Sequence, residues 1–250
     1  MRALSLAVRG FTREWRSGEL GVLLLALTIA VAALTGVGFL VERIGIAVAQ
    51  QATQVLAADL RLESPRPIGA ADFEEATRRG VRSARTVSML SVVFLGDASE
   101  LSDLHAVTAG YPLRGTLKVG AAPFAKGSPA DGIPGRGEAW PSSKLLATLG
   151  GHVGSVLSIG AASFRVTRVL ISRPGEGGTF ADLAPSIVLN AADLPATRLI
   201  QPGSRVTYAA LFSADRARIM DFRGWLAAHR RPGEHLRDIA ETSPQIKGAG

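Results

Sequence analysis

The four histidines, His105, His152, His229 and His235, are the first residues to test for acid–base or metal chemistry. No two of them stand at the His-x-x-x-His spacing that places two imidazoles on one face of a helix for zinc. The Gly-x-Ser-x-Gly and Ser-x-x-Lys patterns of common serine nucleophiles are also missing from the sequence. We therefore predict no catalytic residue and no metal ligand, with His105 in a structural or surface position and His152 in a turn.

Three acidic residues, Asp97, Glu100 and Asp103, lie close together in the chain. A Ca²⁺ site needs more oxygen ligands in a tighter arrangement, so we interpret them as a solvated turn at which a helix begins. ATP binding is not indicated, because none of the four lysines follows a glycine as a P-loop requires. The loop Gly175-Glu176-Gly177-Gly178 lacks the strand–loop–helix context of a phosphate cradle. The sequence thus predicts no cofactor on this chain.

The formal net charge is +7, with arginine as the main cation. Nucleic-acid binding would favour a basic stripe interleaved with aromatic residues. The densest basic group has only Phe73 near it, so a solvated face is the favoured interpretation and nucleic acid is not a predicted partner. That group consists of Arg78, Arg79, Arg82 and Arg85. The absence of cysteine excludes disulfides and thiolate chemistry, and it is compatible with the periplasm.

Residues 20–41 contain no charged side chain and run from Leu20 to Val41. As a helix they would span roughly 33 Å, close to the hydrocarbon thickness of a bilayer. Four arginines precede the segment and only Arg43 follows it closely, so the positive-inside rule places residues 1–19 in the cytoplasm. The first 19 residues are predicted to form an amphipathic segment on the inner lipid surface or, equally, a short disordered basic tail.

A cleaved signal peptide is the alternative to a membrane anchor. Ala47-Val48-Ala49 before Gln50 has the small-x-small form of a cleavage site. The apolar segment is longer than the 7 to 15 residues of a typical signal core, which favours the anchor.

Hydrophobic patterning after the membrane segment predicts a mixture of helices and short strands. Residues 42–58 are predicted to form a stalk helix, and residues 215–229 a helix with Ile219, Phe222 and Leu226 on one face. Strands are predicted at residues 60–64, 86–95, 104–109, 156–159, 164–169, 186–190 and 206–212, some of them in a small barrel or sheet. Shorter helices are predicted at residues 72–79 and 142–149, and a Gly/Pro-rich loop at residues 120–137.

Several longer motifs resemble one known family. The most specific is Asp193-Leu194-Pro195-Ala196-Thr197, which is followed by Ile200-Gln201-Pro202-Gly203-Ser204-Arg205-Val206. The others are Ala58-Asp59-Leu60, Ser64-Pro65-Arg66-Pro67, Tyr111-Pro112-Leu113-Arg114-Gly115 and the stretch from Phe180 through Pro185 to Leu189-Asn190. In this order they resemble the YbbP-type permease subunits of ABC transporters, within the broad MacB/FtsX-like permease group.

The resemblance implies a transport function with no catalytic residues on this chain. ATP would be bound by a separate cytoplasmic ABC ATPase subunit, and stalk helices would pass its motion to a periplasmic domain. Hydrophobic or lipidic compounds are the implied substrates, and a periplasmic esterase is an implied neighbour. Family members continue into further membrane helices, so the resemblance implies that this chain is an N-terminal portion, and it departs from the family at Ala58, where a glycine is expected before Asp59-Leu60.

We therefore expect an α+β fold in the bacterial inner membrane. The expected segments are a cytoplasmic segment (1–19), a transmembrane helix (20–41), a stalk helix (42–58), a two-lobed periplasmic domain (59–213) divided near residues 120–137, and a returning helix with a tail (214–250). The alternatives are a signal-anchored periplasmic hydrolase, which a convergent Ser-His-acid cluster would support, and a secreted binding module.

Overall fold

The computed structural model describes residues 25–32, 35, 57–174 and 185–238. The chain divides into two compact units, Met1–Ala49 and Gln50–Gly250. In the first unit, residues 25–32 are helical, and their large side chains, such as Leu25 and Ile29, are exposed. Within the described ranges, no helix has the length and apolar character that a membrane crossing requires. Most of the predicted membrane and stalk segments lies outside these ranges.

The second unit is built around a closed ring of six strands. They are β2 (Arg82–Leu95), β3 (Ala98–Val107), β10 (Ser186–Asn190), β6 (Glu138–Pro141), β8 (Ala162–Val166) and β7 (Val156–Ile159). The pairing of β7 with β2 closes the ring. The β3–β10 and β6–β8 pairs are parallel, and the other neighbours are antiparallel. The prediction of a small barrel or sheet around residues 156–169 is confirmed as a barrel.

The inside of the barrel is the main hydrophobic core. Alternate residues of each strand point inward, as the two-residue period of a strand requires, so that Val93, Leu104 and Ile187 belong to one buried cluster. Helix α4 (Ser143–Thr148) contributes Leu145 and Leu146 to this cluster. The core therefore depends on strands that lie far apart in the chain.

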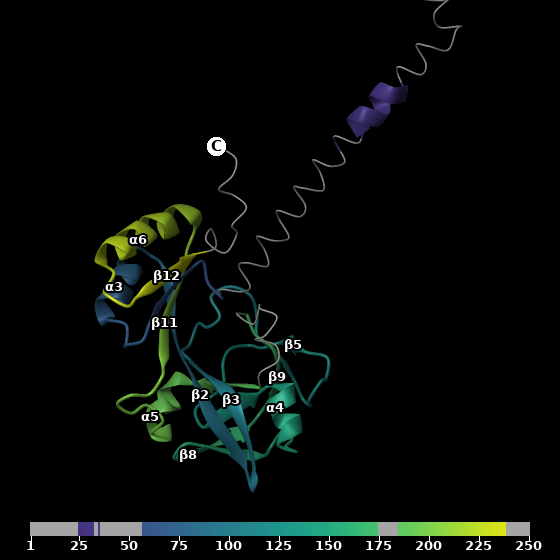
Figure 1. Cartoon of the computed structure of the whole chain (residues 1–250), viewed down its shortest axis with the longest axis vertical. Helices are drawn as coiled ribbons and strands as arrows, with labels where there is room; N and C mark the ends of the chain where they lie inside the picture. Colours follow the sequence, from purple (N-terminus) through teal and green to yellow (C-terminus); the bar gives the residue numbers. More distant parts are fainter. Residues whose placement is uncertain (1–24, 33–34, 36–56, 175–184, 239–250) are drawn as a thin grey trace, which may run out of the picture. The chain divides into compact units, whose positions relative to one another are not determined.

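Three further strands extend the sheet beyond β2. Their order outward is β11 (Thr207–Ser213), β1 (Leu60–Ser64) and β12 (His235–Asp238). Helices α3 (Ala70–Arg78) and α6 (Arg216–His229) lie beside this extension at one end of the domain (Figure 1). A second buried cluster joins strands to helices, with Phe212 of β11 in edge contact with Phe222 of α6 at 4.8 Å. The predicted apolar face of this helix is confirmed: Phe222 and Leu226 are buried, and Ile219 is partly buried against the same cluster.

A small three-stranded sheet lies outside the barrel. It consists of β5 (Ser128–Pro129), β4 (Lys118–Gly120) and β9 (Val169–Ser172). Residues 120–137, predicted as the loop between two lobes, are mostly irregular and include β5 of this sheet. The helix-bearing extension joins the barrel through the pairing of β11 with β2.

The acidic group at residues 97–103 does not begin a helix. Asp97 follows Gly96 in the two-residue turn between β2 and β3, while Glu100 and Asp103 lie on β3. Ten cross-strand pairs join β2 to β3 from Thr86↔Val107 to Leu95↔Ala98. This pairing overrides the local preference of acidic residues for the start of a helix, so that prediction was wrong.

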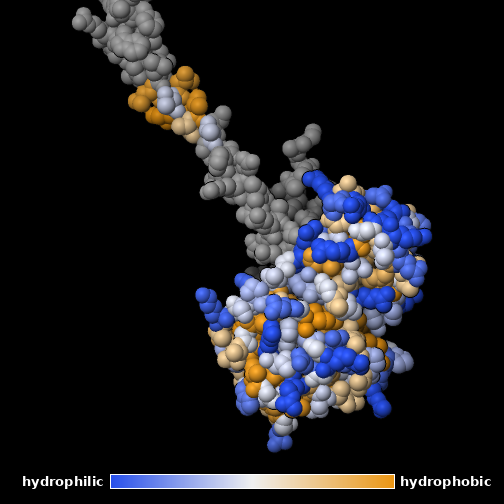
Figure 2. Space-filling model, turned by 180° about the vertical axis from the view of Figure 1, so that it is seen from behind, coloured by the Kyte–Doolittle hydropathy of each residue, from blue (hydrophilic) through white to orange (hydrophobic). Residues whose placement is uncertain are grey.

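The outer face of the β2–β3 hairpin exposes several apolar side chains. Leu90, Val92 and Phe94 alternate along β2, and Leu101 pairs with Val92 across the hairpin. In Figure 2, hydrophobic areas lie on the surface of the barrel part, whereas the part that carries α3 and α6 is mostly hydrophilic. Apolar exposure of this kind marks a surface that can contact apolar ligands or partners.

Candidate functional site

Two of the sequence motifs meet where the chain enters the domain. The guanidinium of Arg114 donates two hydrogen bonds to the carboxylate of Asp59, each at 2.8 Å. The same guanidinium donates to the carbonyl of Ala214 at 3.1 Å. Ser213 Oγ donates to Asp59 Oδ2 at 2.7 Å, and the backbone N–H of Ala214 donates to it at 3.2 Å. We call these four residues the Asp59 junction.

Electrostatics favour the ionised state of the junction. Burial alone raises the pKa of Asp59, but the hydrogen bonds from Arg114 and Ser213 and the charge of Arg114 outweigh it and hold the pKa below 3.8. Hydrogen bonding to Asp59 raises the pKa of Arg114 in turn. A bidentate pair of this kind is among the stronger charge-assisted contacts in proteins.

Backbone contacts complete the junction. The N–H of Arg114 donates to the carbonyl of Ala57 at 2.9 Å, and the N–H of Asp59 donates to Phe212 at 3.0 Å. Ala57 and Ala58 are themselves buried. The residues that precede β1, the end of β11 and the loop at Arg114 are therefore held together by hydrogen bonds.

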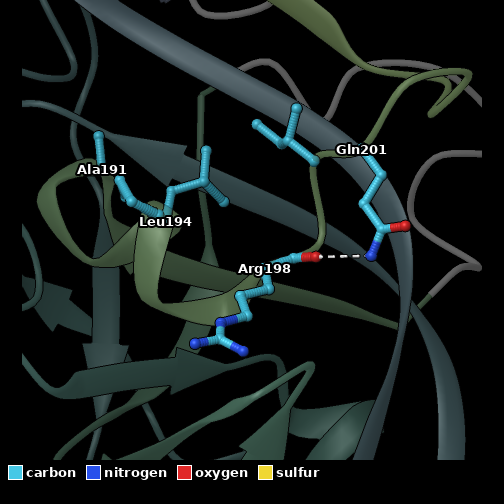
Figure 3. A pocket seen from close by; sticks show the side chains of 6 residues that line it. Ala191, Leu194, Arg198 and Gln201 are labelled. Carbon is cyan, nitrogen blue, oxygen red and sulfur yellow. Dashed lines mark hydrogen bonds between the residues drawn. The ribbon is translucent and has the colours of Figure 1, made fainter.

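A pocket of about 520 Å³ lies beside α5 (Leu194–Thr197), in the motif that most resembles the permease family. Its lining is Ala191, Leu194, Pro195, Arg198, Ile200 and Gln201. Figure 3 shows Leu194 on the α5 side, and Gln201 on the opposite side with its amide nitrogen bonded to the carbonyl of Arg198 at 3.4 Å. The volume falls within the usual range for small-molecule sites.

The turn that carries this pocket is fixed on both sides. At its beginning, Asp193 accepts a hydrogen bond from the N–H of Gly137 at 2.8 Å and pairs with Arg136 at 3.4 Å. At its end, the carbonyl of Thr197 accepts from the N–H of Ala161 at 2.8 Å, in the turn between β7 and β8. The pocket wall is thus preformed by the barrel.

His105 and Asp103 form the cluster closest to a catalytic arrangement. His105 Nε2 lies 2.7 Å from Asp103 Oδ2, and Arg173 Nη2 is 3.8 Å from the same oxygen. Ser88 stands opposite His105 in the strand register, but its hydroxyl makes no hydrogen bond to the imidazole. Burial and the charge of Arg173 lower the pKa of His105 to about 4. They outweigh the hydrogen bond and the charge of Asp103, which raise it. Since no hydrogen bond joins Ser88 to His105, these two residues and Asp103 do not form the Ser-His-acid arrangement of a hydrolase.

We expect His105 to make the domain sensitive to acid. Its pKa is below the usual 6.5, so the unfolded chain binds more protons between pH 6.5 and pH 4 and stability falls as the pH falls through that window. One pKa unit corresponds to about 1.4 kcal/mol, so the loss should reach roughly 2 to 3 kcal/mol. Urea unfolding of the wild type and of His105→Gln at pH 7 and pH 4.5 measures it. An unchanged pH dependence in His105→Gln would assign the acid sensitivity to other groups.

The other sequence-based candidates do not assemble into a site. His152 lies in an exposed turn, as predicted. Over the ranges that the structure describes, no three His, Asp or Glu side chains are grouped closely enough to hold a metal ion. The loop Gly175-Glu176-Gly177-Gly178 falls outside those ranges. Sequence reasoning missed the Asp59 junction and the pocket. Asp59, Arg114, Leu194 and Ile200 lie in motifs that carried the family resemblance, whereas Arg198 lies outside them.

This chain is similar to an ABC transporter permease and to the extracytoplasmic regions of two transporters. The "Uncharacterized ABC transporter permease YbbP" of Escherichia coli (strain K12) is 30% identical over 227 residues, which cover 91% of this chain and 27% of that protein. The periplasmic region of MacB from Actinobacillus actinomycetemcomitans has a TM-score of 0.48 at 12% identity, over 79% of this chain and 97% of that one. The extracellular domain of the ABC-type transporter YknZ from Gram-positive bacteria also has a TM-score of 0.48 at 12% identity, over 72% and 100%.

A family model covers most of the chain. The model of the MacB-like periplasmic core domain matches residues 20–221, from before β1 into α6. The match includes the barrel, the Asp59 junction and the pocket at α5. This chain belongs to the family of MacB-like periplasmic core domains.

Proposed function

We propose that this chain works as part of the membrane subunit of an ABC transporter. Residues 20–41 cross the inner membrane, residues 1–19 stay in the cytoplasm, and the barrel domain works in the periplasm. A separate cytoplasmic subunit binds and hydrolyses ATP. The similarity to a permease and the uncharged apolar segment from Leu20 to Val41 support this proposal.

The Asp59 junction is the observation that most strongly supports coupling between ATP hydrolysis in the partner subunit and movement of the periplasmic domain. It lies where the chain passes from the proposed stalk, residues 42–58, into the domain. The bidentate pair with Arg114 and the hydrogen bonds from Ser213 and Ala214 restrain the backbone at Asp59. A movement of the stalk driven by the ATPase therefore shifts the sheet extension instead of being absorbed in a loop.

The proposed substrates are hydrophobic or lipidic compounds. The apolar lining of the pocket and the exposed side chains on the β2–β3 hairpin support this substrate class. A periplasmic esterase is a further proposed partner, to be sought in the same purification as the ATPase.

Topology is tested by labelling single cysteines, because the natural chain has none. Ser99→Cys places a thiol at an exposed position of β3, and Ser17→Cys places one before the apolar segment. In spheroplasts, a membrane-impermeant maleimide should label the first variant directly and the second only after permeabilisation. Equal labelling of both in intact spheroplasts, or a soluble periplasmic product that starts at Gln50, would contradict the anchored topology.

Docking of an ABC ATPase on this chain is tested by co-purification. The tagged chain is extracted from membranes in mild detergent, and the proteins retained with it are identified by mass spectrometry. An ABC ATPase should be retained, as it is with a full-length permease used as the control. Recovery of the chain from the membrane without any ATPase, when the control retains one, would contradict docking by this chain.

A further inference from the structure

The pocket at α5 combines an apolar wall with one cationic side chain. Leu194, Pro195 and Ile200 supply apolar surface, and Arg198 supplies the charge. Ile200 is 40% exposed although it is a large aliphatic residue. Such a side chain at the edge of a cavity gains free energy when an apolar ligand covers it.

The guanidinium of Arg198 is the cationic group of this pocket. This guanidinium makes no ion pair or hydrogen bond with any residue that the structure describes. The hydrogen bonds of Arg198 are made by its backbone, whose N–H donates to the carbonyl of Pro195 and whose carbonyl accepts from Gln201. The nearest acidic residue of the turn, Asp193, is already bonded to Gly137 and Arg136. Arg198 is therefore available to an anion, and arginine suits carboxylate or phosphate because its donors form a planar fork.

The backbone at Arg198 holds the residue at the rim of the pocket. Arg198 adopts a φ of 54° in the left-handed region, where it ends α5. In Figure 3 the guanidinium of Arg198 points away from Gln201, and both residues line the pocket. The charge thus lies beside the apolar wall and not within it, the arrangement that a ligand with an apolar body and a charged end requires.

We propose that this pocket binds a small amphipathic anion, with its apolar body against Leu194 and Ile200 and its carboxylate or phosphate on Arg198. The role of the ligand as a transported compound rests on the proposed function, whereas the binding itself does not. The apolar wall excludes inorganic phosphate as the main ligand, because a small hydrated anion gains nothing from apolar surface. The preformed turn keeps the ordering cost of binding low.

Calorimetry on the full chain in nanodiscs of phosphatidylcholine tests the proposal. The probes are decanoate and decyl phosphate, with decanol as the uncharged control and inorganic phosphate as the control without an apolar body. Decanoate and decyl phosphate should bind at least tenfold more tightly than either control. Equal binding of decanol and decanoate would overturn the role of the charge, and absence of binding by both anions would overturn the proposal.

Variants assign the binding to this pocket. Arg198→Gln should weaken decanoate binding about tenfold, a change of about 1.4 kcal/mol, whereas Arg198→Lys should retain most of it. Ile200→Ser should weaken decanoate binding several-fold. Arg205→Gln, which removes the charge of another exposed arginine in the following loop, should leave binding unchanged. An equal loss in Arg205→Gln and Arg198→Gln would show a general charge effect and overturn the assignment.

Photo-crosslinking separates two sources of the same ligand chemistry. A photoreactive decanoate and a photoreactive phosphatidylglycerol are offered separately, and the labelled peptides are mapped. Labelling of residues 191–201 by decanoate alone identifies a free acid as the ligand, and labelling by both extends the site to anionic lipid. Labelling confined to other peptides in both arms would overturn the proposal. Binding that persists while the topology or co-purification test fails would remove the transport role and leave the site intact.

Discussion

Replacing Asp59 by alanine is expected to destabilise the domain by about 3 kcal/mol. The substitution leaves the guanidinium of Arg114, whose side chain is 38% exposed, without its carboxylate. Because solvent screens part of this pair, its loss costs about 1 to 2 kcal/mol, less than the roughly 3 to 5 kcal/mol of a fully buried pair, and each hydrogen bond lost with it adds about 1 kcal/mol. It also removes the acceptor for Ser213 Oγ and for the N–H of Ala214. Urea unfolding followed by far-UV circular dichroism measures the change.

Two controls make the Asp59 result specific. Glu74→Ala removes an exposed acid from α3 and should change stability by less than about 0.5 kcal/mol. The double variant Asp59→Ala with Arg114→Ala should lose less than the sum of the single losses, because the two side chains share one contact. Additive losses would show that the pair contributes little. The lowered pKa of Asp59 also predicts that this stability is present above pH 3.8 and is lost as the pH falls through the folded-state pKa.

Replacing Gly160 by alanine is the second change with a large expected effect, about 3 kcal/mol of destabilisation. Gly160 has a φ of 57°, and an added Cβ would overlap the carbonyl oxygen of Thr197. The left-handed conformation costs a non-glycine residue roughly 1 to 2 kcal/mol, and the overlap forces apart the hydrogen bond from Ala161 to Thr197, which contributes about 1 kcal/mol.

Gly96 provides a matched control for the Gly160 variant. Its φ is 58°, but nothing lies within 4 Å of an added Cβ. Gly96→Ala should therefore show only the conformational cost, and the difference between the variants in urea unfolding isolates the contacts with Thr197 and Leu199. Gly160→Ala should also weaken decanoate binding, because Thr197 precedes Arg198. Equal destabilisation by the two variants would show that the contact at Thr197 is unimportant.

Local patterns were sufficient to predict many of the elements. The alternation at residues 60–64 predicted β1, and the strand at residues 156–159 was predicted with its observed bounds. The predicted helix at residues 215–229 is α6, which begins after the cap of Asp215, whose side chain accepts from the N–H of Arg218. Each of these signals lies within a few residues, since capping and the periods of strands and helices are local properties.

The sequence by itself determined the class of the protein and its local elements: an α+β chain with an uncharged apolar segment, motifs shared with transporter permeases, and no familiar nucleophile or nucleotide-binding pattern. Only the tertiary structure decided that β7 closes on β2, that Asp59 meets Arg114 across 55 positions, and that Arg198 and Ile200 line the same pocket. Asp97 and Glu100 illustrate the limit of prediction from local sequence. Their own preference indicated the start of a helix, but cross-strand pairing of β2 with β3 determines the structure there. Such contacts depend on which distant strands pair and on what that pairing buries, and neither the period of a segment nor the type of its residues specifies them.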